Sequence, residues 1–176
     1  MNRTIIIAPV RKSVLVKATP EHAFDVFTAK IDRWWPKTHG IGAAPIQESF
    51  IEPFVGGRWY TRCEDGSDVV VGHVRVWQPG VQLVVTWEIN AAWKPDARVA
   101  FASEVDVRFS PDPAGGTRVE LEHRNFERMG ATEGEAMRNA VDNGWPGLLN
   151  LYVAATATFS RAAPMSSDSK ESSDRA

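Results

Sequence analysis

The sequence predicts an α+β domain in which a twisted antiparallel sheet of about seven strands wraps around a long C-terminal helix, with two short helices between strands 1 and 2. Six segments with strand-like alternation follow one another between residues 46 and 126, and the short Gly-, Pro- and Asp-containing turns between them favour antiparallel pairing. Residues 145–162 form the only segment that is long and apolar enough to cover the apolar face of such a sheet.

The chain begins with a strand, expected at 14–17, and then a helix. Thr19 is a suitable N-cap and Pro20 suits the first helical position. The apolar residues of this helix recur at helical spacing and are Ala23, Phe24, Phe27 and Ile31. We expect the helix to reach Trp34 and Trp35 and to stop there, because Pro36 disfavours helical geometry in the residue before it.

The sheet strands are expected at 46–52, 58–64, 68–77, 82–89, 99–109 and 117–126. Gly56-Gly57, Asp65-Gly66 and Pro79-Gly80 supply turns between them. Alternation assigns an inward face to each later strand, and the inward residues include Leu83, Val85, Trp87, Ile89, Val99, Phe101, Val105, Val107, Phe109, Thr117, Val119, Leu121 and His123.

Two helical pieces are expected at the end, a short one over 133–143 and a longer one over 145–162, with Pro146 in the first turn of the second. The apolar face of the longer piece contains Trp145, Leu148, Leu149, Tyr152 and Phe159. Residues 163–176 are rich in Ser and charge, so we expect a disordered tail after a single domain over 1–162.

The overall composition limits the classes of binding partner that we expect. The chain has 20 Lys plus Arg against 22 Asp plus Glu, and this balance gives no basis for nucleic-acid binding. Cys63 is the single cysteine, which favours a reducing compartment, and no apolar run is long enough for membrane insertion. We expect a soluble, cytoplasmic protein, either a monomer or a homodimer paired through its exposed strand edges.

Six sequence blocks, in order, resemble a known family. They read TPEHAFDVFT, DRWWP, IEPFVGGRWY, GHVRVWQPGVQLVVTW, EVDVRFSP with GGTRVELEHRNFER, and NGWPGLLNLY. The chain resembles the START-like helix-grip (SRPBCC) superfamily, and within it the bacterial single-domain relatives of the activator of heat-shock protein 90 ATPase. The resemblance implies a hydrophobic cavity between the sheet and the terminal helix for lipids, polyketides or other apolar ligands. It also implies a cyclase or aromatase activity in distant members, and a chaperone partner in eukaryotic relatives that carry an additional N-terminal domain.

The inward aromatic residues either fill a core or line a ligand cavity, and both interpretations stay open at this level. If a cavity exists, the expected ligand contacts are Trp35, His39, Trp59, Trp87, Phe101, His123, Trp145, Leu149 and Tyr152. Trp34 continues the buried helical stripe, whereas Trp35 lies at its edge and is expected, with His39, to gate the entrance. A buried His123 is expected to be hydrogen-bonded or neutral.

The sequence contains few motifs that would indicate catalysis or metal binding. The four histidines show no metal-ligand spacing, no nucleophile motif occurs, and no cofactor is implied. His123, Tyr60 and Glu52 are the available acid–base candidates, and Arg58 is expected to pair with Glu52 or Glu48. The leading hypothesis is therefore binding of a hydrophobic or aromatic small molecule. A chaperone-interaction module and a cyclase-like enzyme are the alternatives.

Overall fold

A computed structural model of the chain describes residues 5–161 and confirms the predicted fold class. Seven strands form one antiparallel sheet in the order β1-β7-β6-β5-β4-β3-β2. The elements are β1 Val10–Val16, α1 Pro20–Phe27, η1 Ile31–Arg33, β2 Ile46–Ile51, β3 Arg58–Cys63, β4 Asp68–Gln78, β5 Gln82–Trp87, η2 Val99–Phe101, β6 Ser103–Pro111, β7 Thr117–Arg124, η3 Phe126–Met129 and α2 Ala131–Arg161. The expected tail at 163–176 lies outside the described residues.

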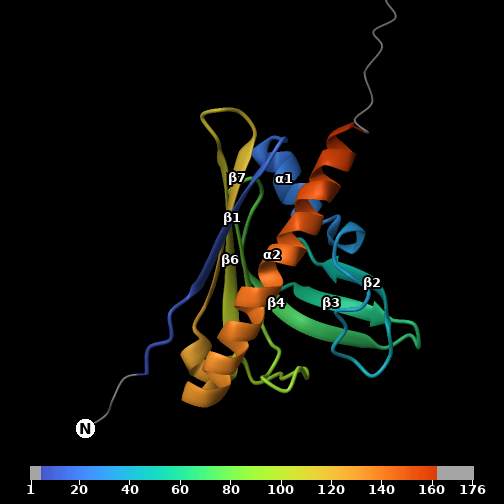
Figure 1. Ribbon diagram of the computed structural model, residues 1–176. Coiled ribbons are helices and arrows are strands. Elements are labelled where there is room, and N and C mark those ends of the chain that lie inside the picture. The colour runs from blue at the N-terminus through green and yellow to red at the C-terminus, as the bar shows by residue number, and fades with distance from the viewer. Residues whose placement is uncertain (1–4, 162–176) are drawn as a thin grey trace, which may run out of the picture.

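The sheet curls around α2, which crosses its concave face obliquely (Figure 1). Three register shifts lie between β2 and β3, between β3 and β4, and between β4 and β5. Such bulges bend a strand and increase its twist. They are confined to the half of the sheet that turns away from β1, β7 and β6 in Figure 1.

The first helix is shorter than the apolar spacing predicts. The Thr19 hydroxyl caps its start by accepting from the backbone N–H of His22 at 3.2 Å, as expected of an N-cap. The prediction of a helix continuing to Trp35 is wrong, because α1 ends at Phe27. The Thr28 hydroxyl donates to the carbonyl of Phe24 at 2.7 Å, and the chain then turns so that the Trp34 indole N–H donates to the carbonyl of Val26 at 3.0 Å. The Phe24 carbonyl still accepts the backbone N–H of Thr28, whereas the Val26 carbonyl binds the Trp34 indole, so the regular helix stops here.

The last helix is one element, so the expected break near Gly144 is wrong. Pro146 lies inside α2, where a proline costs about 3 kcal/mol. Apolar side chains on both sides of it pack into the same core, namely Met137, Val141, Trp145, Leu148, Leu149 and Tyr152. Each contributes about 1.5–3 kcal/mol on burial, and their sum outweighs the proline.

The strand containing Phe101 also starts later than expected. Residues 99–101 form the short helix η2, and β6 begins at Ser103. The Arg98 guanidinium lies over the Phe101 ring at 4.4 Å, and the Phe101 backbone N–H donates to the Arg98 carbonyl. The local turn therefore places Phe101 on the surface with 45% of its side chain exposed, and its predicted inward position is wrong.

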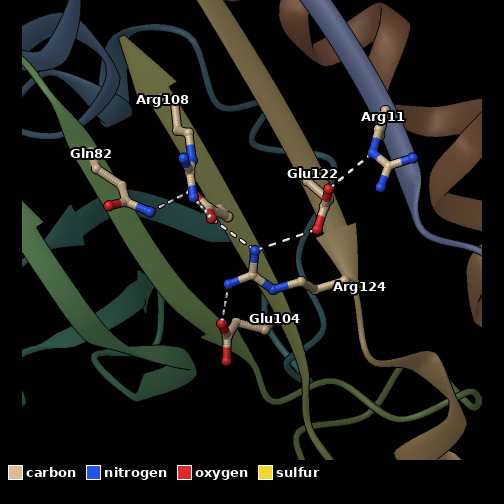
Figure 2. A network of polar contacts seen from close by, with 7 residues as sticks. Arg11, Gln82, Glu104, Arg108, Glu122 and Arg124 are labelled. Carbon is tan, nitrogen blue, oxygen red and sulfur yellow. Dashed lines mark hydrogen bonds and ion pairs between the residues drawn. The ribbon is translucent and has the colours of Figure 1, made fainter.

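The outer face of the sheet carries a charge network built on a buried carboxylate. The Asp106 side chain is 3% exposed and accepts hydrogen bonds from Gln82 at 3.0 Å and Arg124 at 2.7 Å. Arg124 also binds Glu104 at 2.6 Å and Glu122 at 3.4 Å. Figure 2 shows the labelled members Arg11, Gln82, Glu104, Arg108, Glu122 and Arg124. Burial raises the pKa of Asp106, but the bonds from Gln82, Arg124 and Arg108 outweigh it and hold this pKa below its usual value.

Candidate ligand-binding pocket

A cavity of about 440 Å³ lies between the curled half of the sheet and the N-terminal half of α2. Its wall combines the loop after η1, strands β3 to β5, the loop after β5, and one side of α2. The lining residues are Trp35, Thr38, His39, Gly40, Ile41, Thr61, Val71, Trp87, Ile89, Trp93, Ala140, Val141, Gly144, Trp145 and Leu148. The volume lies within the range of about 300–1,000 Å³ typical of small-molecule sites.

Strand and helix periodicity explain most of this wall. Alternation along β3 points Thr61 to the same side as Trp59, which is buried. On α2, Val141, Gly144, Trp145 and Leu148 follow at spacings of three and four residues and so share a face. A Cβ atom added at Gly144 would meet no atom within 4 Å, so this glycine leaves open space on the helix side of the pocket.

Four tryptophans form a closed ring of contacts behind and around the cavity, three of them edge-to-face and the Trp87–Trp145 contact tilted. The ring centroids are 5.0 Å apart for Trp35–Trp59, 5.7 Å for Trp59–Trp87, 6.0 Å for Trp87–Trp145 and 6.3 Å for Trp35–Trp145. Contacts of this geometry stabilise one another beyond the area that they bury. The pocket therefore has a rigid aromatic wall.

The lining is electrically neutral. No Asp, Glu, Lys or Arg belongs to it, and His39 is its one titratable side chain among the described residues. The Thr61 side chain is almost fully buried and forms no hydrogen bond with any residue in the described part of the chain, so its hydroxyl is available to an occupant. This combination suits a neutral, largely apolar molecule with a small number of polar atoms.

His123 lies behind the wall and is fully buried. The Trp145 indole N–H donates to His123 Nδ1 at 3.1 Å, and because an indole can only donate, Nδ1 must carry a lone pair. The neutral ring then carries its proton on Nε2, which donates to the Ser103 hydroxyl at 2.8 Å. Burial lowers the pKa of His123 to about 3, so the ring is neutral at pH 7. Its geometry is that of a satisfied core histidine that orients Trp145.

Eight of the nine predicted contacts divide into two groups, and Phe101 lies apart from both. Trp35, His39, Trp87 and Trp145 lie on the pocket wall. Trp59, His123, Leu149 and Tyr152 are buried in the core that supports this wall. The Tyr152 hydroxyl donates to the carbonyl of Ala23 at 2.7 Å, which ties α2 to α1, and burial raises the pKa of this tyrosine. Phe101 lines a second cavity of about 160 Å³, which it shares with Trp87 but with none of the other predicted contacts.

The tryptophan pair after α1 separates as the sequence indicates. Trp34 packs on Phe27 and Tyr152, with ring centroids 5.1 Å and 5.4 Å away, and lies in the core. Trp35 reaches the pocket, and the exposed His39 ring lies 6.4 Å from it. The gating role of Trp35 and His39 remains a prediction.

Sequence reasoning missed much of the wall. Thr61 could have been found from its register, two residues after Trp59 on the inward face of β3. Val141 and Leu148 lie one turn on either side of Trp145 and extend the same helical face. Trp93 lies in a loop, where no periodicity points to it.

The polar groups outside the pocket form ion pairs and no metal site among the described residues. Within residues 5–161 there is no group of three or more His, Cys, Asp or Glu side chains placed to hold a metal ion. The expected pair of Arg58 with Glu52 is confirmed at 3.0 Å, and its hydrogen bonds lower the pKa of Glu52. His73 Nδ1 contacts Glu88 at 2.6 Å on the outer side of the sheet, away from the pocket wall.

No helix in the described range is both long and apolar enough to cross a membrane.

Comparison with known proteins gives one family and several solved relatives. The family model described as Activator of Hsp90 ATPase homolog 1-like protein matches residues 17–154. The anthrahydroquino-gamma-pyrone synthase Txn09, complexed with SUM, is 38% identical, with 85% of this chain and 97% of that chain covered and a TM-score of 0.60. The self-sacrificing resistance protein CalC from Micromonospora echinospora is 31% identical, with 86% and 95% covered and a TM-score of 0.60. Protein MLL2253 from Mesorhizobium loti, 18% identical with 86% and 98% covered and a TM-score of 0.62, shares the fold. No curated protein matches the chain.

Proposed function

Since the chain belongs to the Activator of Hsp90 ATPase homolog 1-like family, we propose that it binds a hydrophobic or aromatic small molecule in the pocket between the curled sheet and α2. One observation carries the proposal: a cavity of about 440 Å³ has tryptophans on its wall and no charged side chain in its described lining. A filled core would have left no room for an occupant, whereas this volume is sufficient for a small organic molecule.

The two relatives above 30% identity support an aromatic occupant. Txn09 is named as the synthase of an anthrahydroquinone fused to a pyrone, which is a flat, oxygen-bearing aromatic compound. CalC is named as a self-sacrificing resistance protein. Both likenesses extend over 85% or more of this chain, so the pocket region is included in the comparison.

A second candidate function is an interaction with a chaperone, which the family's description favours. It predicts stimulated ATP turnover when the protein is mixed with the host's chaperone. The cyclase-like alternative has less support, because His123 lies behind the wall and neither Tyr60 nor Glu52 belongs to the lining. It predicts that His123→Ala keeps the ligand bound but stops its conversion.

Filling the pocket from α2 tests the binding proposal. Gly144→Phe should place a ring in the cavity, because an added Cβ at this position meets no atom within 4 Å. Gly147→Phe is the matched control: its added Cβ is equally free, but Gly147 does not line the pocket. Native mass spectrometry of protein purified under mild conditions should show a bound small molecule in the wild type and in Gly147→Phe, and none in Gly144→Phe.

The same spectra report stoichiometry and therefore the oligomeric state. If the wild type carries no ligand and takes up no flat aromatic probe such as 1,8-dihydroxyanthraquinone, the binding proposal is wrong. Equal occupancy of the two folded glycine variants would also contradict it, because the ligand would then lie elsewhere.

A further inference from the structure

Trp93 has a backbone conformation that is unusual for a large side chain. Its φ is 58°, and within the described residues Asn125, with φ 67°, is the only other non-glycine residue with a positive value. Asparagine is among the residues that tolerate this left-handed region, whereas the Cβ of a bulky aromatic residue crowds the backbone there. The loop therefore holds Trp93 against its own conformational preference.

A closed turn enforces this conformation. The Asn90 side-chain oxygen accepts the backbone N–H groups of Ala92 at 3.0 Å and Lys94 at 3.1 Å. The Asn90 backbone N–H donates to the carbonyl of Lys94 at 3.0 Å, and the Trp93 N–H donates to the carbonyl of Asn90 at 2.9 Å. The bridge between Ile89 and Pro95 joins the two ends of the turn. The backbone conformation at Trp93 is thus set by the turn itself, without a ligand.

The indole of Trp93 has no partner that would explain its position. The other six tryptophans each contact an aromatic ring. Trp93 forms no ring contact and no side-chain hydrogen bond with the described residues, and 44% of it is exposed at the pocket. Strained residues of this kind concentrate where a ligand is held. The turn holds this backbone conformation without using the indole, which is left free to contact a molecule in the pocket.

We propose that Trp93 is the stacking face for the ligand, and that the pocket therefore selects flat, neutral, fused aromatic molecules over aliphatic chains. This inference rests on the proposed function and specifies the ligand class for the same site. Trp87 and Trp145 line the same pocket as Trp93, so a flat ring system there meets more than one aromatic side chain. The uncharged lining disfavours an ionised ligand, and the free Thr61 hydroxyl suits a carbonyl or hydroxyl oxygen on the ring system.

Substitutions at Trp93 separate the strain of its backbone from the contact of its ring. Trp93→Gly removes both, because glycine adopts positive φ freely, whereas Trp93→Ala removes the ring and keeps a Cβ at φ 58°. Asn125→Gly is the matched control, since it relieves the other positive-φ position, which lies outside the pocket lining. The probes are 1,8-dihydroxyanthraquinone and 1-decanol, and isothermal titration calorimetry measures their dissociation constants.

We expect both Trp93 variants to bind the anthraquinone about tenfold more weakly than the wild type, with less than about a threefold change for decanol. Trp93→Gly should melt above Trp93→Ala, and Asn125→Gly should bind both probes as the wild type does. Unchanged anthraquinone affinity in the Trp93 variants, or equal losses for the two probes, would overturn the inference while the binding function stood. A wild type that binds neither probe would instead contradict the proposed function itself.

Discussion

Replacing His123 with asparagine should change how the stability of this protein depends on pH. The folded protein keeps His123 neutral down to a pKa of about 3, whereas the unfolded chain protonates it at its ordinary pKa of 6.5. Below pH 6.5 the unfolded state therefore binds one more proton than the folded state. The stability contributed by the neutral ring is complete above pH 6.5 and is lost as the pH falls toward 3.

The size of the effect follows from this window. Each pH unit below 6.5 lowers the free energy of unfolding by about 1.4 kcal/mol, so the wild type loses about 2 kcal/mol from this group by pH 5. His123→Asn does not titrate, and its side-chain oxygen can still accept the Trp145 indole N–H. At pH 7.5 this variant should be less stable by about 1–3 kcal/mol, because the bond to Ser103 and contacts with Phe126 are lost.

Urea unfolding of both proteins from pH 7.5 to pH 4.5 measures the difference directly. The unfolding free energies of the wild type and of His123→Asn should converge as the pH falls and meet near pH 5, because the remaining titratable groups are the same in both proteins. Ser103→Ala is the control: it should cost about 1 kcal/mol at neutral pH and keep the wild-type slope, since its histidine remains buried. Parallel curves for the wild type and His123→Asn would refute the assignment of a buried neutral ring.

Three further substitutions test the framework that holds the pocket. Arg124→Gln leaves the buried Asp106 without its closest cation, so it should lower the free energy of unfolding by about 2–4 kcal/mol and move acid unfolding, followed by circular dichroism, to higher pH. Gly72→Ala should prevent folding or lower the melting temperature by more than about 10 °C, because the added Cβ would lie 1.8 Å from the Thr86 carbonyl oxygen. Tyr152→Phe should cost about 1 kcal/mol in urea unfolding through loss of the bond that ties α2 to α1.

The substitutions at Arg124 and Gly72 each have a matched comparison. Arg62→Gln removes an exposed pair with Asp68 and should cost less than about 1 kcal/mol. Gly66→Ala meets no neighbouring atom, but its positive φ should still cost about 1 kcal/mol, far less than Gly72→Ala. A Gly72→Ala protein of wild-type stability would mean that β4 and β5 do not approach as described. An acid-unfolding midpoint in Arg124→Gln at the same pH as in the wild type would contradict the role given to Asp106.

Strand positions could be predicted from the sequence because their signals are local. Alternation and turn dipeptides placed all seven strands, and the inward residues Trp87 and His123 are buried as that alternation requires. Helix ends could not be predicted, because they depend on distant contacts. The bond from the Trp34 indole to the α1 backbone ends one helix early, and a core shared on both sides of Pro146 keeps the other continuous.

The pocket was harder to predict than the fold for the same reason. Inward register identifies which residues face the helix, but it does not separate the pocket wall from the core behind it. Trp145 reaches the cavity while Tyr152, two turns further along the same face, fills the space beside α1. Trp93 depends on a turn closed by one asparagine side chain, and Phe101 on stacking with Arg98, and neither interaction has a periodic signature.

The closed ring of tryptophans also has an optical consequence. Indoles whose centroids lie 5.0–6.3 Å apart are close enough to exchange excitation energy, so we expect Trp35, Trp59, Trp87 and Trp145 to be coupled in emission, together with Trp34, whose ring lies 5.7 Å from that of Trp35. A quenching molecule that touches any one of these rings should lower the fluorescence intensity of the whole group. The emission of Trp59 should therefore respond to a molecule in the cavity, although Trp59 does not line it. Intrinsic fluorescence is therefore a label-free readout of pocket occupancy that is built into the protein itself.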